Sequence, residues 1–209
     1  YWLSKKVPRP ESTAKTPEEI VRQCKRFLRP YSDKDLLLDL GCGELLPILE
    51  LMRIEEYFVS GVGVEKGGFT GRIRAYDYSP EMVEKARANV ASIPDPDKRR
   101  KIEVFESDIT TPEFRAELNG QRFTIITLID VLQDLPLDTI EPTLKWLIES
   151  ALAPKGKIFI SVLTENDREF VADKVRGVLD RLKAAQGLEI EEIDSHHLGN
   201  DDLERTVFE

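Results

Sequence analysis

The stretch DLLLDLGCGE at residues 35–44 decides the fold class, because it joins a short apolar run to a glycine turn. A short apolar run that ends in turn residues is typical of a strand buried on both faces of a parallel sheet. Gly41 and Gly43 lack a Cβ, so the backbone there can turn sharply and a ligand can approach it closely. The stretch predicts a buried strand followed by a helix, with either a ligand site or an ordinary connection at the turn between them.

The same alternation continues along the chain. Further strand candidates lie at 72–76, 101–106, 123–129 and 157–163, and helical patterns lie at 45–56, 80–91, 139–151 and 166–185. Alternating strands and helices predict an α/β fold with a mainly parallel sheet, helices on both faces and right-handed crossovers. Two last strand candidates, 188–194 and 203–209, are joined by a short loop that suits an antiparallel pair.

The segment before the first strand is expected to be an irregular arm and a cap helix. Residues 1–16 contain two prolines, a basic cluster and no apolar period. Thr16 can cap a helix that starts at Pro17 and ends before Pro30. We therefore expect an arm with its cap helix at 1–34 and a main domain at 35–209. A glycine-rich insertion lies within that domain at 57–71.

Composition limits the partners and the compartment. Of 209 residues, 41% are apolar, which is enough for one continuous core. No run approaches the ~20 apolar residues that span a bilayer, and no basic-then-apolar leader opens the chain, so membrane insertion and export are not expected. The net charge of -9 disfavours nucleic acid as a partner. Two cysteines, Cys24 and Cys42, are too few for a disulfide framework, which favours a reducing, cytoplasmic location.

An acidic residue, Asp77, follows the second strand candidate. A carboxylate at this strand end can accept hydrogen bonds from both hydroxyls of a ribose, although capping is the simpler alternative. Ser79 and Pro80 favour a helix start directly after it. Glu65 competes for the ribose role, since it lies closer to the expected spacing of ~20 residues from the glycine turn. The lysine and glycines after Glu65 cannot start a stable helix, so Asp77 is preferred.

Five motifs in this order resemble those of class I S-adenosylmethionine-dependent methyltransferases. They are LDLGCGE, YDYSPEMVEKARANV, ESDIT, IDVLQDLP and LAPKGKIFIS, and they lie between residues 35 and 163. The resemblance implies a Rossmann-like three-layer fold with a seven-stranded, mostly parallel sheet whose last strand is antiparallel. It also implies S-adenosylmethionine as the cofactor.

The resemblance further implies cofactor contacts from residues that follow the strands. The methionine end would be contacted at the glycine turn by Asp39, Gly41, Cys42 and Gly43. The ribose and the adenine would be contacted by Asp77, Tyr78, Asp108 and Ile109. The transferred methyl would be contacted by Asp130 and Val131. Two features depart from the family's pattern. Leu45 occupies the place of the usual third glycine, and the insertion at 57–71 is unusual.

No universal catalytic residue is expected, because methyl transfer from a sulfonium needs chiefly alignment of the nucleophile and exclusion of water. A base is needed only if the acceptor atom carries a proton. The candidates are Asp130, Asp134, His196 and His197. Asp134 is more simply a loop residue and the two histidines are more simply solvated. The sequence offers no convincing metal-ligand spacing.

Four hypotheses for the function follow. The leading one is a methyltransferase that acts on a small molecule, since the chain lacks a basic groove or an added nucleic-acid module. The second has a protein or RNA acceptor, with the basic run 98–101 as its footprint. The third is a cofactor-binding scaffold without turnover, motivated by Leu45 and the insertion. A nicotinamide dehydrogenase is disfavoured because the turn lacks the third glycine.

Overall fold

The computed structural model describes residues 32–52, 69–163, 169–186, 192–194 and 205–208. Several expectations lie outside the described residues. These are the arm and cap helix as far as residue 31, the insertion between 57 and 68, and the roles considered for Cys24, Glu65, His196 and His197.

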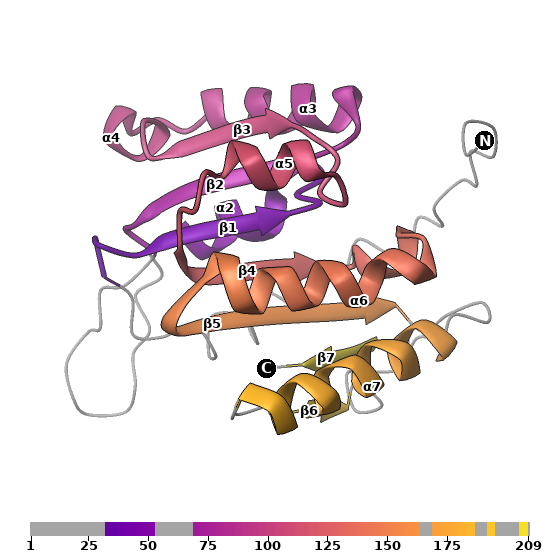
Figure 1. Cartoon of the computed structure of the whole chain (residues 1–209). Coiled ribbons are helices and arrows are strands. Elements are labelled where there is room, and N and C mark those ends of the chain that lie inside the picture. Colours follow the sequence, from indigo (N-terminus) through magenta and orange to yellow (C-terminus); the bar gives the residue numbers. More distant parts are fainter. Residues whose placement is uncertain (1–31, 53–68, 164–168, 187–191, 195–204, 209) are drawn as a thin grey trace, which may run out of the picture.

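A parallel sheet forms the centre of the molecule (Figure 1). Its five parallel strands are β1 (Leu36–Leu40), β2 (Arg72–Asp77), β3 (Ile102–Glu106), β4 (Phe123–Ile129) and β5 (Leu152–Leu163). The strand order is β3-β2-β1-β4-β5-β7-β6, in which the short β7 (Arg205–Phe208) pairs antiparallel with both β5 and β6 (Glu192–Asp194). The α/β class with a parallel sheet, as predicted from the sequence, is confirmed.

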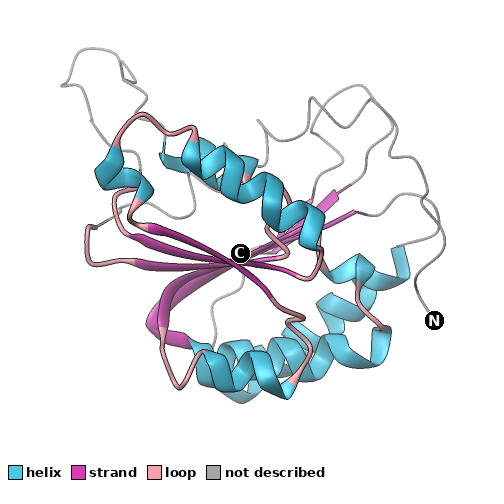
Figure 2. Cartoon of the chain, turned by 90° about the horizontal axis from the view of Figure 1, so that it is seen from above, coloured by secondary structure: helices cyan, strands magenta, loops and turns pink. Residues whose placement is uncertain are grey.

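Helices cover both faces of the sheet, which gives three layers (Figure 2). The helical segments are α2 (Leu46–Met52), α3 (Pro80–Ala91), α4 (Pro96–Arg99), α5 (Pro112–Glu117), η2 (Leu132–Asp134), α6 (Leu137–Trp146), the π-helical η3 (Leu147–Ala151) and α7 (Glu169–Gln186). Side chains of Ser79, Asp95 and Thr111 cap α3, α4 and α5, each of which has proline in its first turn. In the described part of the chain, none of these helices is long and apolar enough to cross a membrane.

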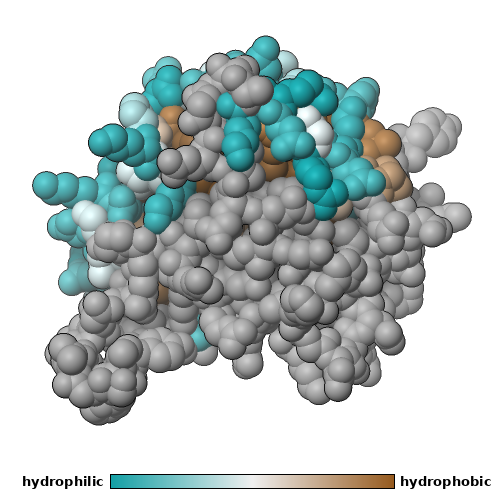
Figure 3. All heavy atoms as spheres, turned by 90° about the horizontal axis from the view of Figure 1, so that it is seen from below, coloured by the Kyte–Doolittle hydropathy of each residue, from teal (hydrophilic) through white to brown (hydrophobic). Residues whose placement is uncertain are grey.

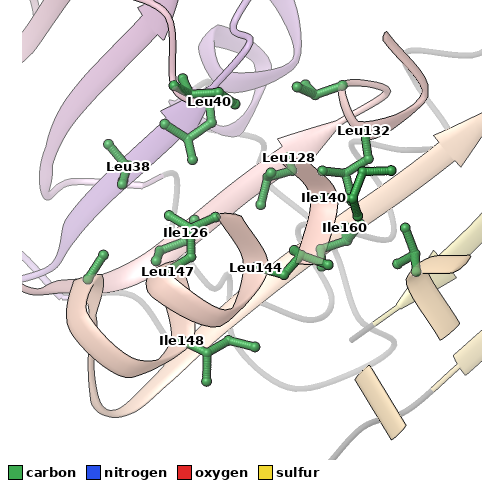
Figure 4. Close-up of a cluster of buried hydrophobic side chains, with 14 of the residues drawn as sticks. Leu38, Leu40, Ile126, Leu128, Leu132, Ile140, Leu144, Leu147, Ile148 and Ile160 are labelled. Atoms are coloured by element: carbon green, nitrogen blue, oxygen red, sulfur yellow. The ribbon is translucent and has the colours of Figure 1, made fainter. Parts of the chain in front are cut away.

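The alternating side chains of β1 divide the core in two. Leu38 and Leu40 face the layer of α5, α6 and α7, where they join apolar residues of β4 and β5 (Figure 4). Leu37 faces the opposite layer and packs with residues of α2 and α3. Because both faces of β1 are buried, its sequence is almost continuously apolar. Asp39 is the exception, and it lies at the edge where the strand ends.

Some element boundaries differ from the prediction. The expected strand at 157–163 begins at Leu152, and its pairing with β4 shifts register between Phe123 and Ile125. Lys155 in this first part has a left-handed φ of 62°. The Pro-Lys-Gly sequence around it is typical of a turn, and here it forms the irregular start of the strand. The short helices α4 and α5 were not predicted, because four and six residues are too few to show a helical period.

Candidate functional site

The glycine turn after β1 and the loop after β4 meet at the carboxyl edge of the sheet. The strand order reverses between β1 and β4, and ligands of open α/β sheets bind at such a switch point. Val131 packs directly on Gly41, since a Cβ added to Gly41 would lie 2.4 Å from its Cγ2. Gly41 also has a φ of +66°. The close packing and the left-handed backbone therefore both require glycine here.

Asp77 joins this turn to the start of α3. Its Oδ2 accepts a hydrogen bond from the N–H of Gly43 at 2.8 Å, and its Oδ1 accepts one from the N–H of Ser79 at 2.9 Å. Gly43 has a φ of +52°, and a Cβ placed there would meet no atom of the described residues within 4 Å. Within the described part of the chain, the turn thus presents an open backbone surface next to a buried carboxylate.

A second carboxylate, Asp39, lies beneath the turn and is only 3% exposed. The hydroxyl of Thr127 on β4 donates to its Oδ1 at 2.6 Å. Burial raises the pKa of Asp39 to about 7; the Thr127 hydrogen bond opposes the rise and the charge of Asp77 adds to it. Asp39 therefore holds a proton for part of the time at neutral pH.

Cys42 lies between the two glycines and is buried. Burial raises the pKa of its thiol, and the negative charges of Asp39 and Asp77 raise it further. The thiolate is the nucleophilic form of cysteine, so Cys42 is not a nucleophile in this site. Its backbone N–H donates to the carbonyl of Tyr76 at 3.0 Å, which ties the turn to the end of β2.

Leu45, which replaces the family's third glycine, keeps the backbone conformation that favours glycine. Its φ is 65°, its N–H donates to the carbonyl of Cys42 at 2.8 Å, and its side chain is fully buried in the core against α2. The left-handed conformation costs roughly 1–2 kcal/mol for a residue with a Cβ. Burial of the leucine side chain offsets this cost.

The two contributions at this position can be separated by substitution. We expect Leu45→Ala to lower the free energy of unfolding by about 2–3 kcal/mol, because it leaves a cavity and keeps the strained backbone. Leu45→Gly should cost about 1 kcal/mol less than Leu45→Ala, since glycine relieves the strain. Urea denaturation of both variants measures the difference. A glycine variant less stable than the alanine variant would show that the strain is absent.

The residues expected to contact the adenine follow β2 and β3, which are neighbours in the sheet. Tyr78 is 76% exposed. Asp108 is exposed, and its Oδ1 accepts from the N–H of Thr110 at 2.9 Å and from its hydroxyl at 2.7 Å. Ile109 is buried within the core cluster of the α5–α7 layer. Tyr78 and Asp108 are thus accessible to a ligand at this edge, whereas Ile109 is mainly a core residue.

Exposed apolar side chains gather at the same edge. Among the described residues, the large exposed hydrophobic side chains are Leu46, Tyr78, Leu137 and Phe170. Each lies at or next to the start of a helix that follows a strand, and therefore at the carboxyl edge. Among the described atoms that can be seen in Figure 3, most are hydrophilic, with smaller hydrophobic patches between them. The surface beside the switch point is suited to contact with a partly apolar ligand.

The loop after β4 carries two of the candidate bases. Asp130 is partly buried and has a φ of 55°, whereas Asp134 is exposed. Ser161 on β5 donates to the carboxylate of Asp130 at 2.8 Å. Sequence reasoning missed both Ser161 and Thr127. Their signal is a hydroxyl within an otherwise apolar buried strand, where a polar group needs a hydrogen-bond partner.

The chain matches a known protein family over most of its length. A family model described as a methyltransferase domain matches residues 13–205. The chain belongs to this methyltransferase family. It is an S-adenosylmethionine-dependent methyltransferase, and S-adenosylmethionine is its cofactor. No curated protein matches the chain by sequence.

Solved methyltransferase structures share the fold. The methyltransferase domain of bacterial CtHen1 is 16% identical, with a TM-score of 0.61 over 92% of this chain and 95% of that one. A putative rRNA-methylase from Clostridium thermocellum is 14% identical, with a TM-score of 0.62 over 90% and 94%. The glycopeptide N-methyltransferase MtfA is 16% identical, with a TM-score of 0.60 over 92% and 89%. At these identities the likeness concerns the fold alone.

The residues at the switch point fit the chemistry of this cofactor. S-adenosylmethionine has a ribose with two hydroxyls and a positively charged sulfonium. The open backbone at Gly43 leaves room for a ligand, which a Cβ would reduce. Asp77 ends β2 and Asp130 follows β4, the two strands on either side of β1, and their negative charge favours a cationic ligand.

Proposed function

We propose that this methyltransferase acts on a small-molecule acceptor and holds its cofactor at the edge formed by β1, β2 and β4. The observation that carries the site assignment is the bridge from Asp77 to Gly43 and Ser79. This bridge fixes an acid beside an open glycine turn at the switch point. In the proposal, the cofactor contacts are Asp39, Gly41, Cys42, Gly43, Asp77, Tyr78, Asp108, Ile109, Asp130 and Val131.

The mechanism is an in-line displacement. When held by the residues named above, the cofactor would supply an electrophilic methyl for transfer to the acceptor's nucleophile, and the electron pair of the methyl–sulfur bond would stay with sulfur. The protein aligns the acceptor and excludes water, which contributes most of the effect. Asp130 is partly buried and Asp134 is exposed, so Asp130 is the better-placed base for an acceptor that carries a proton.

The location of the basic run at 98–101 favours a small-molecule acceptor over RNA. The run directly precedes β3, so it lies at the amino edge of the parallel sheet, opposite the candidate site. Its four side chains already have protein partners, which are the carbonyl oxygens of Met52, Ile93 and Thr70 and the carboxylate of Asp97. A basic patch that guided RNA to the site would have to lie beside it.

We also infer two finer features of the fold. The native sheet has seven strands with the last antiparallel, which the pairing of β7 with β5 supports. We propose that the methyltransferase domain spans 35–209 and follows a separate segment at 1–34. The insertion in this domain is 57–71.

Calorimetric titration of the wild type and Asp77→Ala tests the site. We expect S-adenosylmethionine and S-adenosylhomocysteine to bind the wild type in the micromolar range, and NAD not to bind. Asp77→Ala should weaken both sulfur ligands by about a hundredfold, because a charged acceptor of hydrogen bonds is lost. Tyr76→Phe is the matched control, since its hydroxyl contacts Glu117 instead of the site. Equal affinity in the wild type and Asp77→Ala would contradict the assignment, and binding of NAD alone would contradict the cofactor.

A methyl-label transfer assay tests the acceptor class. Label from S-adenosylmethionine should enter a small-molecule extract in the presence of the enzyme and remain absent from RNA and protein fractions. Label in RNA or protein would support the alternative acceptor. Cofactor binding without transfer to any fraction would favour the scaffold hypothesis.

A further inference from the structure

Ser161 is a fully buried polar residue on β5, next to the proposed site. Its hydroxyl donates to Oδ1 of Asp130 at 2.8 Å. The backbone N–H of Asp130 lies 3.1 Å from both the hydroxyl and the carbonyl oxygen of Ser161. One residue of β5 therefore fixes both the backbone and the carboxylate of Asp130.

Asp130 has a left-handed backbone with a φ of 55°. This region is unfavourable for most residues with a Cβ, although aspartate and asparagine adopt it more often than the others do. The amide of Gln133 donates to its carbonyl oxygen at 2.5 Å, so contacts hold the N–H, the carbonyl and the carboxylate. A strained conformation persists where surrounding contacts determine it, and such positions gather at functional sites.

Asp130 and its hydrogen bonds to Ser161 lie next to the proposed cofactor site. It directly precedes Val131, which packs on Gly41 of the glycine turn at the switch point. Asp77, at the end of β2, uses its two carboxylate oxygens to bind backbone N–H groups on the other side of this turn. Asp130 thus adds a preorganised negative charge on the β4 and β5 side of the proposed site.

We propose that Ser161 positions the carboxylate of Asp130 as a counter-charge to the sulfonium, so that the site prefers the methylated cofactor to its demethylated product. This inference rests on the proposed cofactor site. S-adenosylmethionine carries a positive charge on sulfur and S-adenosylhomocysteine does not. A fixed carboxylate attracts the first and not the second, with no cost of reorganisation on binding. The preference helps the product to leave after each turnover.

The test compares the dissociation constants of three ligands by calorimetry. They are S-adenosylmethionine, S-adenosylhomocysteine and an analogue in which a protonated amine replaces the sulfonium. Asp130→Asn removes the charge but keeps an oxygen that can accept from Ser161, and asparagine tolerates the left-handed backbone. We expect this variant to bind both cationic ligands roughly tenfold more weakly and the neutral product unchanged.

Ser161→Ala keeps the charge and removes its support. The preference for the cationic ligands should fall about threefold, and the Ser161→Ala/Asp130→Asn double variant should lose no more than Asp130→Asn alone. Thr143→Val is the control, because it removes a buried hydroxyl of α6 that has no hydrogen-bond partner among the described residues, and it should leave the preference unchanged.

Each outcome distinguishes this inference from the proposed function. An equal loss of all three ligands in Asp130→Asn would indicate a merely structural role and overturn the inference. An unchanged preference in Asp130→Asn would overturn it as well. If the wild type bound neither sulfur ligand, the cofactor site itself would be wrong.

Discussion

Replacement of Gly41 with alanine should lower the free energy of unfolding by about 3 kcal/mol and abolish cofactor binding. The new Cβ would lie 2.4 Å from Cγ2 and 2.9 Å from Cγ1 of Val131, closer than carbon atoms pack. Overpacking of this kind costs about 1–3 kcal/mol, and the φ of +66° adds roughly 1–2 kcal/mol for any residue with a Cβ. Urea denaturation measures the first effect and calorimetric titration with S-adenosylmethionine measures the second.

A second substitution at Val131 isolates the packing contribution. In a Val131→Ala background the two Cγ atoms are gone, although the Cβ of residue 131 would still lie 3.2 Å from the new methyl. The cost of Gly41→Ala should therefore fall to about 1–2 kcal/mol in that background. An unchanged cost would show that Val131 does not determine the choice of glycine.

Gly43→Ala is the matched control for backbone conformation. Gly43 has a similar φ of +52°, but a Cβ there would meet no atom of the described residues within 4 Å. We expect its stability cost to be only about 1 kcal/mol. The methyl would occupy the open side of the turn, so cofactor affinity should still fall. Equal destabilisation by the two alanine substitutions would exclude overpacking as the cause.

The fold class could be predicted because the sequence of β1 is typical of a strand that is buried on both faces of a parallel sheet. Its residues from Leu37 to Leu40 are all buried, and a strand covered on both faces must be almost continuously apolar. Strand β4, at Phe123–Ile129, was predicted with its observed bounds for the same reason. The start of β5 was not, because Ala153 to Gly156 carry turn residues and only the pairing with β4 draws them into the sheet.

The site could be predicted in part. The positions of Asp39, Asp77 and Asp130 at strand ends follow from the strand boundaries alone. Their partners do not. Thr127 lies 88 positions from Asp39 in sequence, and Ser161 lies 31 from Asp130, so both pairs depend on the register between neighbouring strands. Periodicity within one strand carries no information about that register.

Loss of the proton from Asp39 should lower the free energy of unfolding as the pH rises. Burial in the core raises the pKa of this carboxyl from an ordinary 3.8 to about 7, so the folded protein holds the proton more tightly than the unfolded chain does. The stabilising contribution of the proton is complete below pH 4 and is lost as the pH rises through about 7. With 1.36 kcal/mol for each pKa unit, the total loss is about 4 kcal/mol.

Asp39→Asn removes this titration and should flatten the profile. The amide cannot lose a proton, and its oxygen can still accept from the hydroxyl of Thr127. Urea midpoints at pH 5, 6, 7 and 8 should decrease for the wild type and change much less for the variant. The slopes are compared instead of the absolute values, because the amide also introduces buried N–H donors of its own.

Asp33→Asn provides the control, since this aspartate is exposed on the surface before β1. Its profile should follow that of the wild type. If Asp39→Asn also followed the wild type, the proton would be held elsewhere, and Asp39 would be ionised throughout the range. A flattened profile would instead place a neutral carboxyl under the glycine turn near neutral pH. In that case the negative charge that the turn offers to a cationic cofactor comes chiefly from Asp77 and Asp130.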